Sequence, residues 1–186
     1  EGAKKHKIGI AQIVSHPALD QSREGFKDAL KEAGLDVEYD EQNAQGDITI
    51  ANTIANKFVT DKVDLIFSIA TPTTQAAVNA TSSIPIIFTA VTDPEAAGLI
   101  KPNVTGSSDR VDNVAEQLDV LKELNPNATT IGVLYNSSEQ NSVTQVELIK
   151  KVAAEKGIKV EEQAVTAVSE LTQALDNLLS KADALY

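Results

Sequence analysis

Hydroxyl groups gather at one predicted strand-to-helix junction, the segment Ser68–Gln75. The apolar run before it is typical of a buried strand, and Pro72 suits the first helical position, with Thr71 at the cap. A helix that starts at the carboxyl end of a parallel strand presents unpaired amide groups and the positive end of its dipole. Together with the hydroxyl groups of Thr71, Thr73 and Thr74, this junction could hold a carboxylate or another small anion. The alternative is that it is only a capped helix start.

Catalytic and metal-binding patterns are missing from the sequence. His6 and His16, the two histidines, lack the paired spacing of a metal site, and there is no cysteine. No G-x-S-x-G motif, no phosphate loop ending in Gly-Lys-Ser/Thr and no G-x-G-x-x-G fingerprint occurs. We therefore expect no catalysis, no cofactor and no metal. An enzyme of the doubly wound type is the alternative, and turnover with a nucleotide or nicotinamide cofactor would reveal it.

Composition narrows the class of partner. The formal net charge of −11 argues against nucleic acid and against an anionic membrane surface, both of which require basic patches. No segment approaches the roughly 20 consecutive apolar residues of a membrane span. Residues Glu1 to His6 are predicted to form a mobile polar leader.

Apolar runs alternate with helical patterns along the chain, which is typical of doubly wound parallel α/β sheets. The predicted strands are 7–14, 37–39, 63–67, 84–90, 130–135, 158–162 and the start of one at 184–186. Helices are predicted after residue 20, after Asp47 as a cap, from Thr71, over 112–124, after residue 142 and over 169–181. Gly34 and Gly157 each follow a helix, where glycine is favoured.

The second part of the chain repeats the first. Three pairs of segments match: 8–10 with 131–133, 32–38 with 155–161, and 62–67 with 181–186. The first two pairs share an offset of 123 residues, and the third pair is four residues closer. We predict two homologous α/β lobes, 1–108 and 109–186, joined near Ser107–Asp112. Because Tyr186 corresponds to Phe67, we expect an incomplete second lobe and a chain that is the N-terminal portion of a longer one.

Polar loops follow four of the predicted strands. They are Ser15–Asp20, Ser68–Thr74, Thr89–Pro94 and Asn136–Ser142. Ligands of open parallel sheets bind beyond the carboxyl ends of the strands, and two hinged lobes can close around a small molecule. In the last loop, Ser137 and Gln140 have the spacing of a capping box, and Ser137 and Ser138 could join the threonines in holding a carboxylate.

Aromatic residues near these loops could serve either ligand binding or the fold. His16 and Tyr135 could pack on a ring-bearing ligand or could serve only the fold. Phe88 lies within a predicted strand and is better explained as a core residue.

Four stretches together resemble one family. They are residues 10–20 (IAQIVSHPALD), 70–73 (ATPT), 88–94 (FTAVTDP) and 134–142 (LYNSSEQNS). They resemble the ABC-transporter substrate-binding proteins of the tryptophan/tyrosine-binding type, over essentially the whole chain. The Ile-Val-x-His-Pro-Ala-Leu-Asp loop is the most specific part of the resemblance.

The resemblance implies two Rossmann-like lobes of the periplasmic-binding-protein fold. It also implies an extracytoplasmic, often lipid-anchored receptor that delivers a solute, commonly an aromatic amino acid, to a membrane permease. We expect a monomer. The anchoring cysteine of the family is absent from this chain, and the family's chain continues past Tyr186 to a further cleft loop. A sugar- or nucleoside-binding lobe pair of a sensor is the alternative, although such sites stack sugars on Trp or Phe and this chain has no Trp and four Phe.

Ligand-binding residues follow from the resemblance and from the loops. They are Ser15, His16, Thr71, Thr73, Thr89, Asp93, Tyr135, Asn136, Ser137, Ser138 and Asn141. The carboxylate of an amino acid would lie toward Thr71–Thr73 and the Ser137–Ser138 turn. The ammonium group would need an acceptor, either Asp93 or a residue beyond Tyr186.

Overall fold

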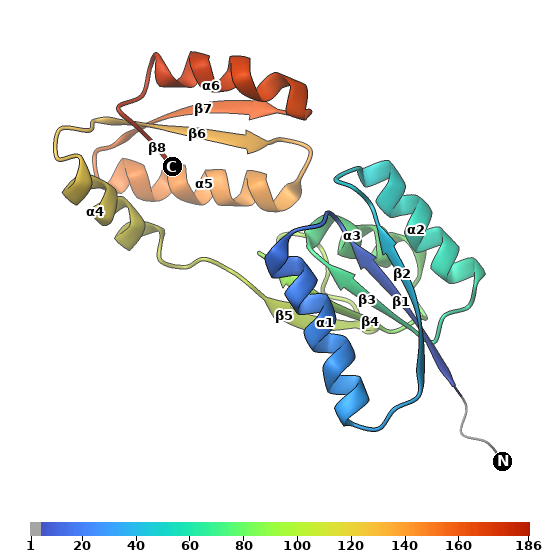
Figure 1. Ribbon diagram of the computed structural model, residues 1–186. Helices are drawn as coiled ribbons and strands as arrows, with labels where there is room; N and C mark the ends of the chain where they lie inside the picture. The colour runs from blue at the N-terminus through green and yellow to red at the C-terminus, as the bar shows by residue number, and fades with distance from the viewer. Residues whose placement is uncertain (1–4) are drawn as a thin grey trace. The chain divides into compact units, whose positions relative to one another are not determined.

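Parallel strands and helices alternate in the structure, a computed structural model that describes residues 5–186 (Figure 1). The strands are β1 (His6–Gln12), β2 (Val37–Asn43), β3 (Leu65–Ile69), β4 (Ile86–Val91), β5 (Val104–Ser108), β6 (Thr130–Asn136), β7 (Lys159–Val165) and β8 (Ala184–Leu185). The helices are α1 (Pro17–Glu32), α2 (Ile48–Thr60), α3 (Thr71–Ala80), α4 (Val114–Leu124), α5 (Gln140–Glu155) and α6 (Leu171–Leu179), with a short 3-10 helix, η1 (Val168–Glu170). The predicted α/β class with parallel sheets is confirmed.

The chain divides into two compact units between Arg110 and Val111, two residues beyond the boundary that the sequence predicts. Residues 1–4 of the predicted polar leader lie outside the described residues. The prediction that the leader includes His6 is wrong, because His6 begins β1 and its amide donates to the Asp36 carbonyl at 3.2 Å. Among the described residues, no helix is both long and apolar enough to cross a membrane.

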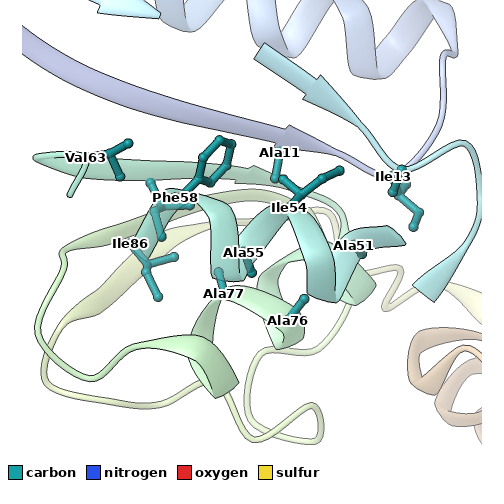
Figure 2. Close-up of a cluster of buried hydrophobic side chains, with 12 residues drawn as sticks. Ala11, Ile13, Ala51, Ile54, Ala55, Phe58, Val63, Ala76, Ala77 and Ile86 are labelled. Atoms are coloured by element: carbon teal, nitrogen blue, oxygen red, sulfur yellow. The ribbon is translucent and has the colours of Figure 1, made fainter. Parts of the chain in front are cut away.

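The first unit is a five-stranded parallel sheet in the order β2-β1-β3-β4-β5. Side chains alternate between its two faces. On one face, Ile8, Ile10, Phe67 and Ile69 pack against α1, where the ring of Phe26 stacks on Phe67 at a centroid distance of 3.9 Å. The other face is covered by α2 and α3, and Figure 2 shows the side chains that fill this layer.

The starts of the first three helices differ in their caps. Asp47 caps α2 as predicted, since its Oδ1 accepts from the amides of Thr49 and Ile50 at 2.6 and 3.2 Å. α1 begins at Pro17 with His16 as its cap, so the predicted loop Ser15–Asp20 is shorter than expected. The predicted cap Thr71 is off by one residue, because Ala70 holds the cap position of α3.

β5 is not among the strands predicted from the sequence. It pairs with β4, and four of its five residues are exposed. An edge strand with little buried surface carries few apolar residues, so no apolar period marks it in the sequence. β2, at the opposite edge, is longer than predicted, because its added residues are polar and show no apolar period. Two of them, Asp40 and Glu41, form salt bridges with Lys57 and Lys27 respectively.

The second unit repeats the start of the first. Its three-stranded parallel sheet has the order β7-β6-β8, which matches β2-β1-β3. Val114, Leu118, Val146 and Ile149 from α4 and α5 pack on one face. The predicted helix 169–181 is a 3-10 turn followed by the shorter α6, which lies on the other face.

Equivalent hydrogen bonds support the repeat at atomic level. In the first unit the Lys7 amide donates to Asp64 Oδ2 at 2.9 Å, and in the second the Thr130 amide donates to Asp183 Oδ2 at 3.0 Å. Each aspartate returns its own amide to the carbonyl of the same partner, at 2.7 and 2.9 Å. The two units therefore tie the strands β3 and β8 to their neighbours β1 and β6 in the same way.

Candidate functional site

The predicted site residues lie at the carboxyl ends of the strands in both units. In the first unit, Ser15 and His16 follow β1, Thr71 and Thr73 follow β3, and Thr89 and Asp93 lie at the end of β4. These three strands are neighbours in the sheet, so the structure brings these six residues to one edge. In the second unit, β6 ends with Tyr135 and Asn136, the turn holds Ser137 and Ser138, and Asn141 lies in the first turn of α5.

The start of α3 is strained. Ala70, its cap residue, has φ 85° and ψ 159°, a region of backbone space that is essentially reserved for glycine and costs about 1–3 kcal/mol for other residues. Its amide donates to the Thr89 carbonyl at 3.0 Å, which joins the ends of β3 and β4. Strain of this kind is characteristic of ligand-binding and catalytic sites, so it supports a functional role for this edge.

The three threonine hydroxyl groups of this junction are not equivalent. Thr73 Oγ1 donates to the carbonyls of Ile69 and Ala70 at 2.7 and 3.0 Å, and Thr74 Oγ1 to that of Ala70 at 2.9 Å. Thr71 is 2% exposed, and its Oγ1 has no hydrogen-bond partner within the part of the chain that the structure describes. Of the three hydroxyl groups that were expected to bind an anion, only that of Thr71 therefore has its hydrogen left to donate.

Backbone amides complete this group of donors. The first turn of an α-helix leaves its amides without intrahelical acceptors. Pro72 has no amide hydrogen, so Thr71 and Thr73 supply the first donors of α3. A hydroxyl and two amides at the positive end of a helix dipole suit a carboxylate.

The turn between β1 and α1 is held by hydrogen bonds to both of its predicted site residues. Asn43 Nδ2 donates to Ser15 Oγ at 3.0 Å. His16 Nδ1 accepts from the Ala18 amide at 3.3 Å, so a neutral His16 ring carries its proton on Nε2. Both side chains are exposed, and the Nε2 group can serve as a donor.

Gln12 lies beneath this turn and was not predicted from the sequence. It is 1% exposed, and its Nε2 donates to the Val14 carbonyl at 2.8 Å and to Asp20 Oδ1 at 2.7 Å. Its Oε1 accepts from Arg23 at 3.2 Å. The hydrogen bond that Arg23 Nε donates to Glu24 raises the pKa of Arg23 above its usual range, so the guanidinium stays charged. The sequence feature that could have indicated this role is a polar residue, Gln12, near the end of an otherwise apolar strand.

The end of β4 bulges away from β5. Phe88 pairs with Gly106 and Val91 with Ser108, so β4 carries one extra residue, and Ala90 takes a left-handed φ of 54°. Gly106 is needed here, because a Cβ on it would lie 2.1 Å from the Phe88 carbonyl oxygen. The bulge presents Thr89, whose Oγ1 lies 3.1 Å from Ser107 Oγ.

Asp93 is engaged within its own unit. Its Oδ1 accepts from two backbone amides of the following turn, at 3.1 and 2.9 Å, and its Oδ2 lies 3.3 Å from a guanidinium nitrogen of Arg110. A ligand ammonium group at Asp93 would therefore share this carboxylate with Arg110.

Both aromatic positions near the strand ends contact a hydrophobic core. Phe88 is buried with Val91 and Leu99, as expected for a core residue. Tyr135 is half-buried and packs against the core of the second unit, which favours a structural role for most of its ring.

The turn after β6 is organised by Asn136. Its Oδ1 accepts from the Ser138 amide and hydroxyl at 3.0 and 2.7 Å, and its Nδ2 donates to Glu139 at 2.9 Å. The predicted capping box is wrong, because Glu139 is the cap residue of α5 and makes no side-chain capping bond. Asn141 Oδ1, one residue beyond the start of α5, is buried without a partner among residues 5–186.

A comparison with protein families settles the class. The family described as ABC transporter substrate binding protein matches residues 7–186. The chain belongs to this family. Groups of three or more potential metal ligands do not occur in the described part of this substrate-binding protein.

The chain is similar to one curated relative and to two solved structures over almost its whole length. A tyrosine-binding protein of Clostridioides difficile (strain R20291) is 44% identical over 196 residues, which covers 100% of this chain and 56% of the relative. A conserved domain protein from Vibrio cholerae has a TM-score of 0.92 at 43% identity, covering 98% of this chain and 65% of that one. An ABC domain from Streptococcus pneumoniae in complex with L-Trp has a TM-score of 0.89 at 41% identity, covering 96% and 63%. This substrate-binding chain thus spans between 56% and 65% of these relatives.

Proposed function

We propose that this substrate-binding protein captures an aromatic amino acid outside the cytoplasm and delivers it to the permease of an ABC importer. Support comes from the family, from a relative named for tyrosine binding, and from a similar structure solved with L-Trp. Binding requires no catalysis and no cofactor, and the protein acts as a lipid-anchored monomer. Both named amino-acid relatives favour this function over the sugar alternative.

The observation that carries the proposal is the buried hydroxyl of Thr71 at the start of α3, which has no hydrogen-bond partner within residues 5–186. A carboxylate oxygen that accepts from Thr71 Oγ1 would satisfy this donor, and the dipole of α3 would favour its charge. The amides of Thr71 and Thr73 would bind the same carboxylate. All α-amino acids share this group, so the junction provides general affinity rather than selectivity.

Other residues would select amino acids that have an aromatic side chain. We propose that His16 packs on the aromatic side chain and that Thr89 and Asp93 bind the amino end, with Asp93 shared between Arg110 and the ammonium group. Ser15, Asn136, Ser137, Ser138 and Asn141 are proposed as further polar contacts, and Tyr135 as an apolar one. Asn141 Oδ1, which lacks a partner in the described part of the chain, is an acceptor that a ligand N–H group would satisfy.

Isothermal titration calorimetry against the twenty amino acids tests this function, with a panel of sugars and nucleosides as the comparison. We expect saturable 1:1 binding of L-tyrosine and L-tryptophan, weaker binding of aliphatic amino acids, and no heat from sugars. Binding of sugars or nucleosides alone would contradict the proposal, and so would the absence of heat from every amino acid.

A further inference from the structure

Gln12 is a polar residue in a place that packing alone would fill with an apolar one. It is the last residue of β1, an interior strand between β2 and β3, in which Ile8, Ile10 and Ala11 are all buried. Burying a side-chain amide is costly unless its donors and acceptor are satisfied. Here both Nε2 hydrogens and the Oε1 oxygen have partners.

The two acceptors of the Gln12 amide, the Val14 carbonyl and Asp20, lie on either side of the Ser15–His16 turn. One Nε2 hydrogen bond ends on the carbonyl of Val14, directly before Ser15, and the other on Asp20 in the first turns of α1. The Asp20 amide in turn donates to the His16 carbonyl at 2.8 Å. One buried amide therefore links the entry and the exit of the turn that carries Ser15 and His16.

The oxygen of the Gln12 amide is bound by Arg23, which lies among several carboxylates. Arg23 donates to Gln12 Oε1 and lies 3.5 Å from Asp20 Oδ1, 2.9 Å from Glu24 and 3.4 Å from Glu41 of β2. Exposed ion pairs of this kind contribute little one by one, but together they restrict the Arg23 side chain. The Arg23 guanidinium that donates to Gln12 Oε1 is therefore itself held in position.

We propose that Gln12 is a positioning residue that fixes the Ser15–His16 turn for ligand binding. The inference rests on the proposed function, since it assigns Ser15 and His16 to the site. Gln12 does not itself touch the ligand; it acts by holding the Val14 carbonyl and Asp20, which set the direction of both site residues.

The first test needs no ligand. Gln12→Met keeps the volume of the side chain and removes its amide, and Gln12→Glu is a second variant that keeps an acceptor for Arg23. Asn103→Leu is the matched control, because Asn103 Nδ2 also donates to a backbone carbonyl, that of Ile84, at 2.9 Å and at the amino edge of the same sheet. After correction for global stability, we expect about tenfold faster hydrogen exchange at the Asp20 amide in both Gln12 variants and no change in the control. An unchanged Asp20 exchange rate in both Gln12 variants would overturn the proposal.

The second test measures affinity for L-tryptophan. We expect Gln12→Met to raise Kd about tenfold in the otherwise unaltered protein, and less than about twofold when Ser15→Ala and His16→Ala are already present. A merely structural role would produce the same loss in both backgrounds, and that result would contradict positioning through the turn. If the unaltered protein binds no aromatic amino acid, the proposed function fails, while the exchange measurement still decides whether Gln12 holds the turn.

Discussion

Thr71 shows at the scale of one residue how this site differs from an ordinary helix start. An unpaired hydroxyl in a buried position costs about 1–3 kcal/mol, and the strained Ala70 before it costs about as much. Neither feature stabilises the free protein. Both are explained if a ligand carboxylate completes the hydrogen bonding of the junction.

A pair of threonine variants separates binding from stability. Thr71→Val removes an unsatisfied hydroxyl, so we expect the free protein to gain about 1 kcal/mol in the free energy of unfolding. Thr73→Val removes donation to the Ile69 and Ala70 carbonyls, so we expect a loss of about 1 kcal/mol. Urea denaturation of both variants measures the difference. Equal destabilisation by the two substitutions would show that Thr71 is satisfied in the free protein.

Asp183 is predicted to titrate at low pH. Hydrogen bonds from the amides of Thr129 and Thr130 and from the Thr129 hydroxyl lower the pKa of its carboxyl group. Because the pKa is lower in the folded state than in the unfolded state, its contribution to stability is complete above the ordinary aspartate range. That contribution is lost as pH falls through the folded-state pKa.

Carbon-13 NMR of the Asp183 carboxyl group, followed through a pH titration, checks this prediction. We expect a midpoint below the unperturbed value of about 3.9. Asp183→Asn should give a smaller dependence of stability on acid pH than the unaltered protein. A midpoint at or above the unperturbed value would contradict the hydrogen-bonding account.

At the scale of elements, the sequence predicted those parts that a local pattern encodes. The apolar stripe of α2 and its cap Asp47 are both present in the structure. β5 could not be predicted, because its sequence Val-Thr-Gly-Ser-Ser becomes a strand only through pairing with β4. The cap of α3 was off by one residue, since the strained conformation of Ala70 depends on tertiary contacts and is unusual for alanine.

The candidate site divides in the same way. Polar loops at strand ends predict which residues reach the edge of a sheet, and the structure places all of them there. Local hydrogen bonding cannot be read from such a pattern. Three such features appear only in the structure. Within the described residues the Thr71 hydroxyl has no partner, and Asp93 forms an ion pair with Arg110. Gln12 donates a hydrogen bond to the Val14 carbonyl in the turn after β1.

Two glycines test the repeat at the level of sheet and helix. A Cβ on Gly9 would lie 2.7 Å from the ring of Phe58 in α2, and one on Gly132 would lie 2.6 Å from Leu178 in α6. We expect Gly9→Ala and Gly132→Ala each to destabilise the protein by about 1–3 kcal/mol in thermal unfolding. Gly25→Ala is the control, because α1 has open space there and the change should stabilise by about 0.5–1 kcal/mol. A neutral effect at either Gly9 or Gly132 would show that the helix packs differently from its counterpart.

At the scale of the whole molecule, the chain forms two units with separate cores, and the strand order β7-β6-β8 of the second matches the β2-β1-β3 part of the first. The connection between them, residues 109–113, has no regular structure and includes Arg110. We propose it as the domain boundary. The ion pair between Arg110 and Asp93 is too exposed to protect this segment strongly.

Limited trypsin digestion followed by mass spectrometry tests the boundary. We expect the earliest fragments to include one that ends at Arg110, because exposed, irregular connections are preferred sites of cleavage. Arg110→Gln should remove that fragment and slow the separation of the two units. Early cleavage within α1 or α5 instead would contradict the boundary.

The start of α3 is proposed to bind the carboxylate of an aromatic amino acid. Calorimetric titration of L-tryptophan into the unaltered protein and into Thr71→Val tests it most directly. We expect saturable 1:1 binding to the unaltered protein and a Kd about tenfold higher for Thr71→Val, which corresponds to the loss of one hydrogen bond to a charged group. Equal affinity of the two proteins would contradict the claim.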